Sequence, residues 1–302
     1  SNLSYADSGD NDFIINLARI GEQSFEKGSY GYMTILHELG HVVGLSHGQD
    51  DGYVSETDSY YPAIDPNFGW LGWTVMDYRH YIGDNTMAVA GSLVGTRITI
   101  KETGEQYYPT TLMPLDISAS LYLYGYYDVT EEYILNPVNS EDTTYALSFP
   151  FFKTIHDTGG TDTLDWSNIS DDTTVNLNPF SLSYFGTDKI EITQRGTDDV
   201  LIETGFILGL SEFTYIENVK AGSGDDTIQL NSVKNLIEAG AGNDTVSSID
   251  NLDSVYGEEG NDYFQANSLK FLLIDGGIGF DVLTVDQVLL ENGLYSIDFR
   301  DL

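Results

Sequence analysis

The stretch "AGSGDDTIQLNSVKNLIEAGAGNDTV" (residues 221–246) contains the same glycine and aspartate turn twice, with its final aspartates at 226 and 244. Two more copies follow, so the four turns read AGSGDD (221–226), AGAGND (239–244), GEEGND (257–262) and GGIGFD (276–281). Apolar residues stand two positions after each final aspartate and again midway between them, which gives an apolar period of nine. On this grid every position from Ile192 to Leu273 is apolar, before a slip of one residue. A turn plus a short strand with one inward side chain predicts stacked parallel strands, with one coil per two units.

The composition of these turns indicates a calcium-binding edge. Glycine at the second and fourth positions permits positive φ angles that aim carbonyl groups at a common centre, and the final aspartate adds a carboxylate. Oxygen-rich loops of this kind favour calcium, and four stacked turns would supply about three sites or more. The alternate turns, LNSVKN, SIDNLD and ANSLKF, lack the pattern, so we expect a roll with one calcium edge. Solvated turns in an ordinary β-solenoid are the alternative. The predicted calcium residues are Asp226, Asp244, Asp262, Asp281, Gly222, Gly224, Gly240, Gly242, Gly257, Gly260, Gly277 and Gly279.

Upstream, the stretch "HELGHVVGLSH" (residues 37–47) holds three of the five histidines of the chain. On a helix, His37 and His41 are one turn apart and share a face, so both imidazoles can bind one zinc ion. Glu38 lies between them and can act as a general base on the water that zinc activates. Gly44 permits the left-handed conformation that ends a helix, and His47 then returns as a third ligand. The pattern predicts one catalytic zinc, with peptide hydrolysis as the natural chemistry.

Composition limits the other function classes. The 302 residues carry a formal net charge of −36, which disfavours nucleic acid and anionic lipid surfaces as partners. The chain contains no run of eighteen apolar residues, so the sequence predicts no membrane span. It also contains no cysteine, which excludes disulfides. We expect helices at 32–44 and 114–125 in a domain spanning 1–125. A linker at 126–144 and a strand-rich domain at 145–302 should follow.

The full pattern HExxHxxGxxH resembles that of the metzincin zinc peptidases, in which a methionine turn lies beneath the metal. That resemblance implies that Met76, in "WTVMDYRH" (73–80), is the turn methionine. It also implies that Tyr78 supports the oxyanion or serves as a further zinc ligand.

The order of the two halves is similar to that of the serralysins, which join a metzincin domain to a roll of repeats-in-toxin nonapeptides, GGxGxDxUx. The resemblance implies an α+β metzincin-like catalytic domain followed by an all-β parallel roll, and a secreted zinc endopeptidase exported by a type I route without a signal peptide. Asp157, Gly159 and Asp162 would hold a further calcium ion where the roll begins.

Only 36 residues precede His37, too few for the upper subdomain of a metzincin, so we expect a truncated catalytic domain. A separate N-terminal segment or a neighbouring chain would then complete it, and protein or peptide substrates would be its other partners. The alternative function is a calcium-dependent extracellular scaffold or adhesive module with an inactive peptidase domain. The intact zinc pattern favours the peptidase.

Overall fold

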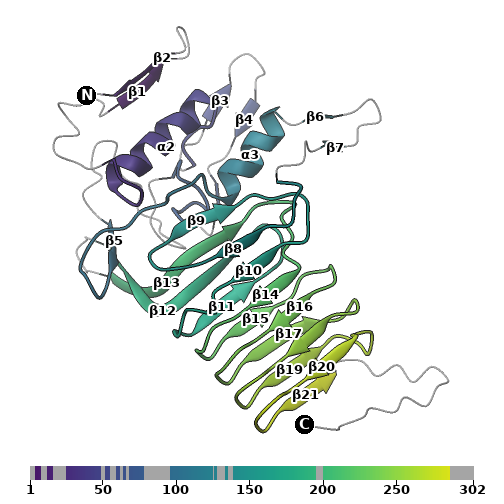
Figure 1. The fold of residues 1–302 in the computed structure, drawn as a ribbon. Coiled ribbons are helices and arrows are strands. Elements are labelled where there is room, and N and C mark those ends of the chain that lie inside the picture. Colours follow the sequence, from purple (N-terminus) through teal and green to yellow (C-terminus); the bar gives the residue numbers. More distant parts are fainter. Residues whose placement is uncertain are drawn as a thin grey trace. The chain divides into compact units, whose positions relative to one another are not determined.

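A computed structural model describes most of the chain (Figure 1). The described residues are 25–48, 64–65, 68–77, 96–124, 139–194 and 200–285, with short strands at 4–7, 12–15, 52–54, 59–61, 126–127 and 133–134. In this part of the chain, none of the helices has the length and apolar character that a membrane crossing requires. Most strand pairings in the second half of the chain are parallel, which is compatible with the predicted fold class.

The chain forms two compact units, each built from separate segments. The first unit comprises residues 1–135, 151–155 and 188–212, and the second comprises 136–150, 156–187 and 213–302. The sequence predicted two domains made of continuous segments, with a linker at 126–144. That domain division stays a prediction.

The described part of the first unit contains two helices. Helix α2 (Tyr30–Val42) begins after Ser29, whose hydroxyl accepts a hydrogen bond from the Tyr32 N–H at 3.1 Å and so satisfies one unpaired donor of the first turn. Helix α3 (Pro114–Tyr124) begins with a proline, which suits a first-turn position because its missing N–H would have no partner there. Both helices lie where the sequence predicts them.

The strands of the first unit are mostly short. Strand β5 (Thr96–Ile100) pairs antiparallel with the end of β12 (Ser181–Gln194), and β9 (Phe152–Ile155) pairs parallel with the end of β13 (Val200–Leu210). The other strands form three antiparallel pairs: β1 (Ser4–Asp7) with β2 (Asp12–Ile15), β3 (Gly52–Val54) with β4 (Ser59–Tyr61), and β6 (Tyr126–Tyr127) with β7 (Tyr133–Ile134).

The second unit consists of two sheets whose strands alternate along the chain (Figure 1). One sheet has the order β20-β18-β16-β14-β10-β8, and the other runs β21-β19-β17-β15-β11 before it reaches the first residues of β12. The strands of the first sheet are β8 (Thr144–Ala146), β10 (Thr163–Asp165), β14 (Asn218–Lys220), β16 (Leu236–Glu238), β18 (Ser254–Tyr256) and β20 (Leu273–Asp275). Those of the second are β11 (Thr173–Asn176), β15 (Thr227–Gln229), β17 (Thr245–Ile249), β19 (Tyr263–Ala266) and β21 (Val282–Val285).

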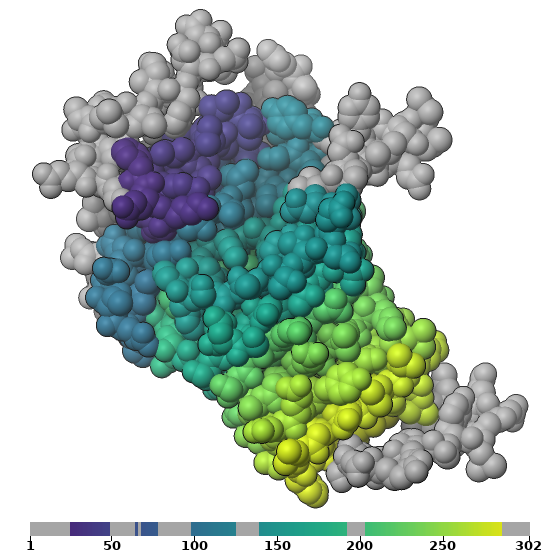
Figure 2. All heavy atoms as spheres, viewed as in Figure 1, coloured from purple at the N-terminus to yellow at the C-terminus, as the bar shows by residue number. Residues whose placement is uncertain are grey.

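We call residues 218–285 the repeat region, because successive coils there pair in register. Val219 pairs with Ile237 and Ile237 with Val255, while Ile228 pairs with Val246 on the other sheet. Each strand from β14 to β19 points an apolar side chain inward, as the nine-residue period predicts. The buried residues of this core are Val219, Ile228, Ile237, Val246, Val255 and Phe264, each at most 1% exposed. In Figure 2 the coils succeed one another from green to yellow.

The apolar grid was wrong at both of its ends. Ile274, rather than Leu273, pairs with Val255, so the slip of one residue comes before this coil and leaves Leu273 39% exposed. At the other end, Ile192 and Leu210 lie in the long strands β12 and β13, outside the repeat region. Apolar residues nine positions apart also occur by coincidence in long strands. The spacing alone does not show which strands pair, so it could not identify where the repeat region begins.

Candidate metal sites

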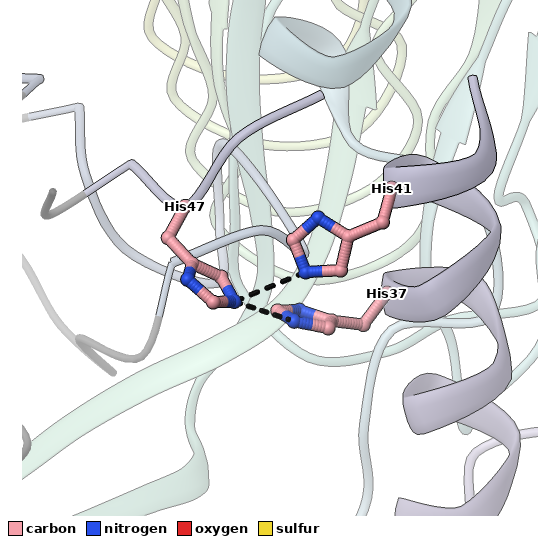
Figure 3. A group of neighbouring side chains, drawn as sticks. All are labelled: His37, His41 and His47. Carbon is pink, nitrogen blue, oxygen red and sulfur yellow. Dashed lines mark hydrogen bonds between the residues drawn. The ribbon is translucent and has the colours of Figure 1, made fainter. Parts of the chain in front are cut away.

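The three histidines of the first unit converge on one point. His37 and His41 extend from adjacent turns of α2, and His47 reaches them from the segment that follows (Figure 3). The Nε2 atom of His47 lies 3.2 Å from that of His37 and 3.0 Å from that of His41. Ligands of a tetrahedral zinc ion with bonds of about 2.0–2.1 Å stand roughly 3.3 Å apart. These two distances fit one metal ion of this kind, and the ligand atoms of all three histidines lie within 4.8 Å of one another.

The Nδ1 atoms of His37 and His41 face backbone carbonyl groups. Nδ1 of His37 lies 2.7 Å from the Val75 oxygen, and Nδ1 of His41 lies 2.8 Å from the Leu45 oxygen. Because a carbonyl oxygen only accepts, both Nδ1 atoms must carry the proton, so each Nε2 presents a lone pair that can bind a metal. Burial lowers the pKa of His37 to about 4, so its ring is neutral at neutral pH.

Local backbone geometry brings the ligands together. Gly44 has φ +88, a left-handed conformation, and the Leu45 N–H bonds to the Gly40 oxygen at 2.9 Å as the helix ends. The chain can then turn back toward α2. Met76 is 2% exposed and packs on Gly40, where a Cβ atom would stand 2.2 Å from its Sδ atom. A side chain at position 40 would therefore displace this methionine.

Of the two predicted catalytic residues, the structure describes only Glu38. Glu38 lies on α2 between His37 and His41 and is half-buried. Tyr78 lies outside the described residues.

The four turn aspartates of the repeat region form a hydrogen-bonded ladder, which we call the aspartate ladder. The backbone N–H of Asp226 donates to Oδ1 of Asp244 at 2.8 Å. The N–H of Asp244 donates in the same way to Asp262, and that of Asp262 to Asp281, each at 2.9 Å. All four side chains are buried. One carboxylate oxygen of each later aspartate thus joins its turn to the turn before it.

The second oxygens of the ladder are the unusual feature. Oδ2 of Asp244, Asp262 and Asp281 is buried and has no hydrogen-bond partner among the described residues. A buried carboxylate oxygen without a donor is costly, and a bound cation would satisfy it. Asp226 differs, because its Oδ2 accepts a hydrogen bond from Nε1 of Trp166 at 3.0 Å. The oxygen pattern therefore fits cations at the three later aspartates.

Burial and mutual repulsion disfavour charge on this ladder. Burial, with smaller contributions from Asp226, Asp262 and Asp225, raises the pKa of Asp244 to about 8. Burial also raises the pKa values of Asp226 and Asp262. Without a counter-ion Asp244 is therefore largely protonated near neutral pH. A bound cation would remove this penalty.

Close stacking of the turns explains their glycines better than positive φ does. The expectation of positive φ at the second and fourth positions was wrong for Gly222 and Gly224, which lie outside the left-handed region. A Cβ atom on Gly222 would nevertheless stand 1.9 Å from the Ile169 oxygen, and one on Gly279 would stand 1.4 Å from the oxygen of Gly260. Among the turn glycines of the repeat region, those with positive φ are Gly240, Gly242, Gly260, Gly277 and Gly279.

On the opposite edge of the repeat region, backbone N–H groups satisfy both oxygens of a buried aspartate. The backbone N–H of Asn235 donates to Oδ1 of Asp253 at 2.8 Å, and Oδ2 of Asp253 accepts from the Asp250 N–H at 2.8 Å. Both oxygens of this buried aspartate are therefore partnered without a cation.

The structure also brings together the residues predicted at the start of the roll. Asp157 and Asp162 are 1% and 2% exposed, and the Gly159 N–H donates to Oδ1 of Asp157 at 3.2 Å. The Tyr145 hydroxyl donates to the other oxygen of Asp157.

Sequence reasoning missed two acidic residues of this cluster. Oε2 of Glu217 accepts from the Asp162 N–H at 2.8 Å, and Oδ1 of Asp142 accepts from the Thr161 N–H at 2.8 Å. Burial, with Asp157, Glu217 and Asp142, raises the pKa of Asp162 to about 6. A separation of 55 residues between Asp162 and Glu217 left no local signal that could have joined them.

Similar proteins of assigned function are metalloproteases. The chain is 29% identical over 243 residues to Metalloprotease AprA of Pseudomonas entomophila, which covers 76% of this chain and 43% of the relative. It is 27% identical over 227 residues to Serralysin of Photorhabdus luminescens, covering 69% of this chain and 38% of that protein. Serralysin C of Dickeya chrysanthemi is 27% identical over 237 residues, covering 74% of this chain and 41% of the relative. The chain is a relative of the serralysin-type metalloproteases. No protein-family model matches it.

The serralysin relationship agrees with the resemblance found in the sequence. The matched region spans about two fifths of the length of these relatives, as their coverage of 43%, 38% and 41% shows. A metalloprotease requires a metal, and among the described residues of this chain His37, His41 and His47 form a group that could hold one.

Proposed function

We propose that this chain is a zinc-dependent endopeptidase that hydrolyses peptide bonds in proteins. The observation that carries the proposal is the convergence of three imidazole Nε2 atoms at about the spacing of a zinc coordination sphere. His37, His41 and His47 would hold the ion. Zinc supplies Lewis-acid activation of water and of the scissile carbonyl.

The chain's own residues would handle the protons. Glu38 accepts a proton from the attacking water and delivers it to the nitrogen of the leaving amine. Tyr78, by resemblance, stabilises the oxyanion. Met76 and Gly44 would have structural roles, the first packed on Gly40 and the second at the end of α2.

We further propose that the aspartate ladder binds calcium. The three unpartnered carboxylate oxygens at Asp244, Asp262 and Asp281, counted among the described residues, support this assignment, and Asp226 closes the ladder at its first turn. The turn glycines allow the carbonyl-bearing backbones to stack closely enough to share ions. Asp157, Gly159 and Asp162, with Glu217 and Asp142 beside them, form the further calcium site of this proposal.

The proposed location is extracellular, with export by a type I route that needs no cleaved signal peptide. Calcium sites of extracellular modules typically bind the ion at about 0.1–1 mM, and the chain has no cysteine that would require oxidation. Its substrates would be proteins or peptides.

Replacing the proposed base separates metal binding from catalysis. Glu38→Gln should retain one zinc per chain but lose at least 100-fold in casein hydrolysis, because an amide cannot accept the proton. The purified chain is assayed in calcium and zinc, and the zinc content of each variant is measured in parallel.

The matched control is Glu105→Gln, which makes the same chemical change at an exposed loop position and should keep full activity. Undiminished hydrolysis by Glu38→Gln would contradict the assignment. Zinc binding without hydrolysis in the unmodified chain would favour the alternative, a calcium-dependent scaffold with an inactive peptidase domain.

A further inference from the structure

A buried carboxylate lies behind the segment that carries Met76. Asp116, in the first turn of α3, is 2% exposed. Its Oδ2 accepts hydrogen bonds from the Val75 N–H at 2.8 Å and from the Met113 N–H at 2.9 Å. Its Oδ1 accepts from the Thr74 hydroxyl. One carboxylate therefore binds two consecutive residues of the methionine turn and the residue that precedes α3.

The hydrogen bonds continue from this carboxylate to the metal centre. The Thr74 hydroxyl, which donates to Asp116, accepts from the Met76 N–H at 2.9 Å. That N–H belongs to the same peptide group as the Val75 carbonyl, which accepts from Nδ1 of His37 at 2.7 Å. The series of donors thus runs from His37, through the peptide between Val75 and Met76, through Thr74, to Asp116.

The direction of these bonds matters for His37. Each donor in the series points toward the carboxylate, so its negative charge polarises every bond in the same sense. The Val75 oxygen becomes a stronger acceptor, which holds the proton on Nδ1 and makes Nε2 a better metal donor. Burial raises the pKa of Asp116 to about 6, so the group is mostly ionised at pH 7.5.

We propose that Asp116, acting through Thr74 and the Val75–Met76 peptide, is a positioning residue that fixes the tautomer and orientation of His37. The inference rests on the proposed zinc site. A purely structural role for Asp116 is the competing explanation, since the same carboxylate anchors the Val75 and Met113 N–H groups.

Two substitutions at Thr74 test the relay without touching those anchors. Thr74→Val removes the hydroxyl that links Asp116 to the Met76 N–H but leaves Asp116 bonded to Val75 and Met113. Thr74→Ser keeps the hydroxyl and is the matched control. Asp116→Asn, in an otherwise unmodified chain, removes the charge while keeping an acceptor oxygen.

Zinc affinity and the protonation of His37 are the two measurements. The dissociation constant is measured by competition with a zinc-binding dye, and the tautomer is measured by nitrogen NMR of the ¹⁵N-histidine-labelled, metal-free protein. Thr74→Val and Asp116→Asn should each weaken zinc binding by roughly 10- to 100-fold. Both should also shift the His37 signals away from the Nδ1–H form, whereas Thr74→Ser should keep both values near those of the unmodified chain.

The outcomes separate this inference from the zinc proposal. Unchanged zinc affinity and an unchanged Nδ1–H signal in Thr74→Val would overturn the relay, even if the variant unfolds more easily. A chain that binds no zinc would contradict the proposed function, while the tautomer measurement on the metal-free protein would still decide whether the relay exists. If Asp116→Asn does not fold, the comparison of Thr74→Val with Thr74→Ser still tests the relay by itself.

Discussion

At the scale of single residues, the aspartate ladder shows how an unsatisfied group can indicate a ligand. Asp244, Asp262 and Asp281 each use one oxygen to bond the preceding turn, and their second oxygens have no donor in the described part of the chain. Trp166 supplies the missing donor at Asp226. The sequence predicted all four aspartates as equivalent calcium residues, because the indole comes from 60 residues away and is not visible in the repeat.

The raised pKa of Asp244 predicts how the metal-free repeat region responds to pH. Its folded-state value of about 8 exceeds the usual 3.8, so the folded form binds a proton that the unfolded form releases between these pH values. Folding without calcium should therefore become less favourable as pH rises from 6.5 to 8. Far-UV circular dichroism in excess chelator should show more β structure at pH 6.5 than at pH 8.

Two variants locate this effect. Asp244→Asn should raise the β signal at pH 8 and flatten its pH dependence, because the neutral side chain imitates the protonated aspartate. Glu259→Gln removes a charge from an exposed position of the next turn and should leave the slope in place. A β signal that falls on acidification from pH 8 to pH 6.5 would contradict the account of Asp244.

At the scale of elements, local sequence patterns predicted the helices and the short strands better than they predicted which strands pair. The nine-residue period identified the strands of the repeat region and the inward residues from Val219 to Phe264, because each strand repeats the same local environment. Both helices followed from spacing and from their terminal proline and glycine. The long strands β12 and β13 and the register of β20 were not predictable, because they depend on contacts with distant segments.

The ladder also predicts a calcium-dependent change in these sheets. Strands β14 to β21 hold three or four residues each, except for β17 with five, so each contributes few hydrogen bonds and little buried apolar area of its own. With carboxylates crowded on one edge, the metal-free region should be loosely folded, and calcium should order it. A circular-dichroism titration should show β structure increasing with calcium and not with an equal concentration of magnesium, whose octahedral geometry suits these turns less well.

One outcome of the calcium titration would contradict calcium-dependent folding of the repeat region. Full β structure in excess chelator at pH 8, unchanged on addition of calcium, would show that the turns are solvated loops of an ordinary solenoid.

At the scale of the whole molecule, the acidic composition is compatible with the cation sites proposed in each unit. The formal charge of −36 disfavours folding through self-repulsion, and bound cations would offset part of it. The three histidines lie in the first unit and the aspartate ladder in the second, so the described ligands proposed for each metal come from one unit. The sequence predicted both groups of ligands, whereas Asp116, Trp166 and Glu217 became visible only once the chain was folded.

The most direct test of the central claim is X-ray absorption at the zinc edge of the purified chain, loaded with one equivalent of zinc in excess calcium. We predict a first shell with three imidazole nitrogens at about 2.0–2.1 Å, reduced to two by His47→Ala. A shell made of carboxylate oxygens alone, or a spectrum that His47→Ala does not change, would contradict the assignment of zinc to His37, His41 and His47.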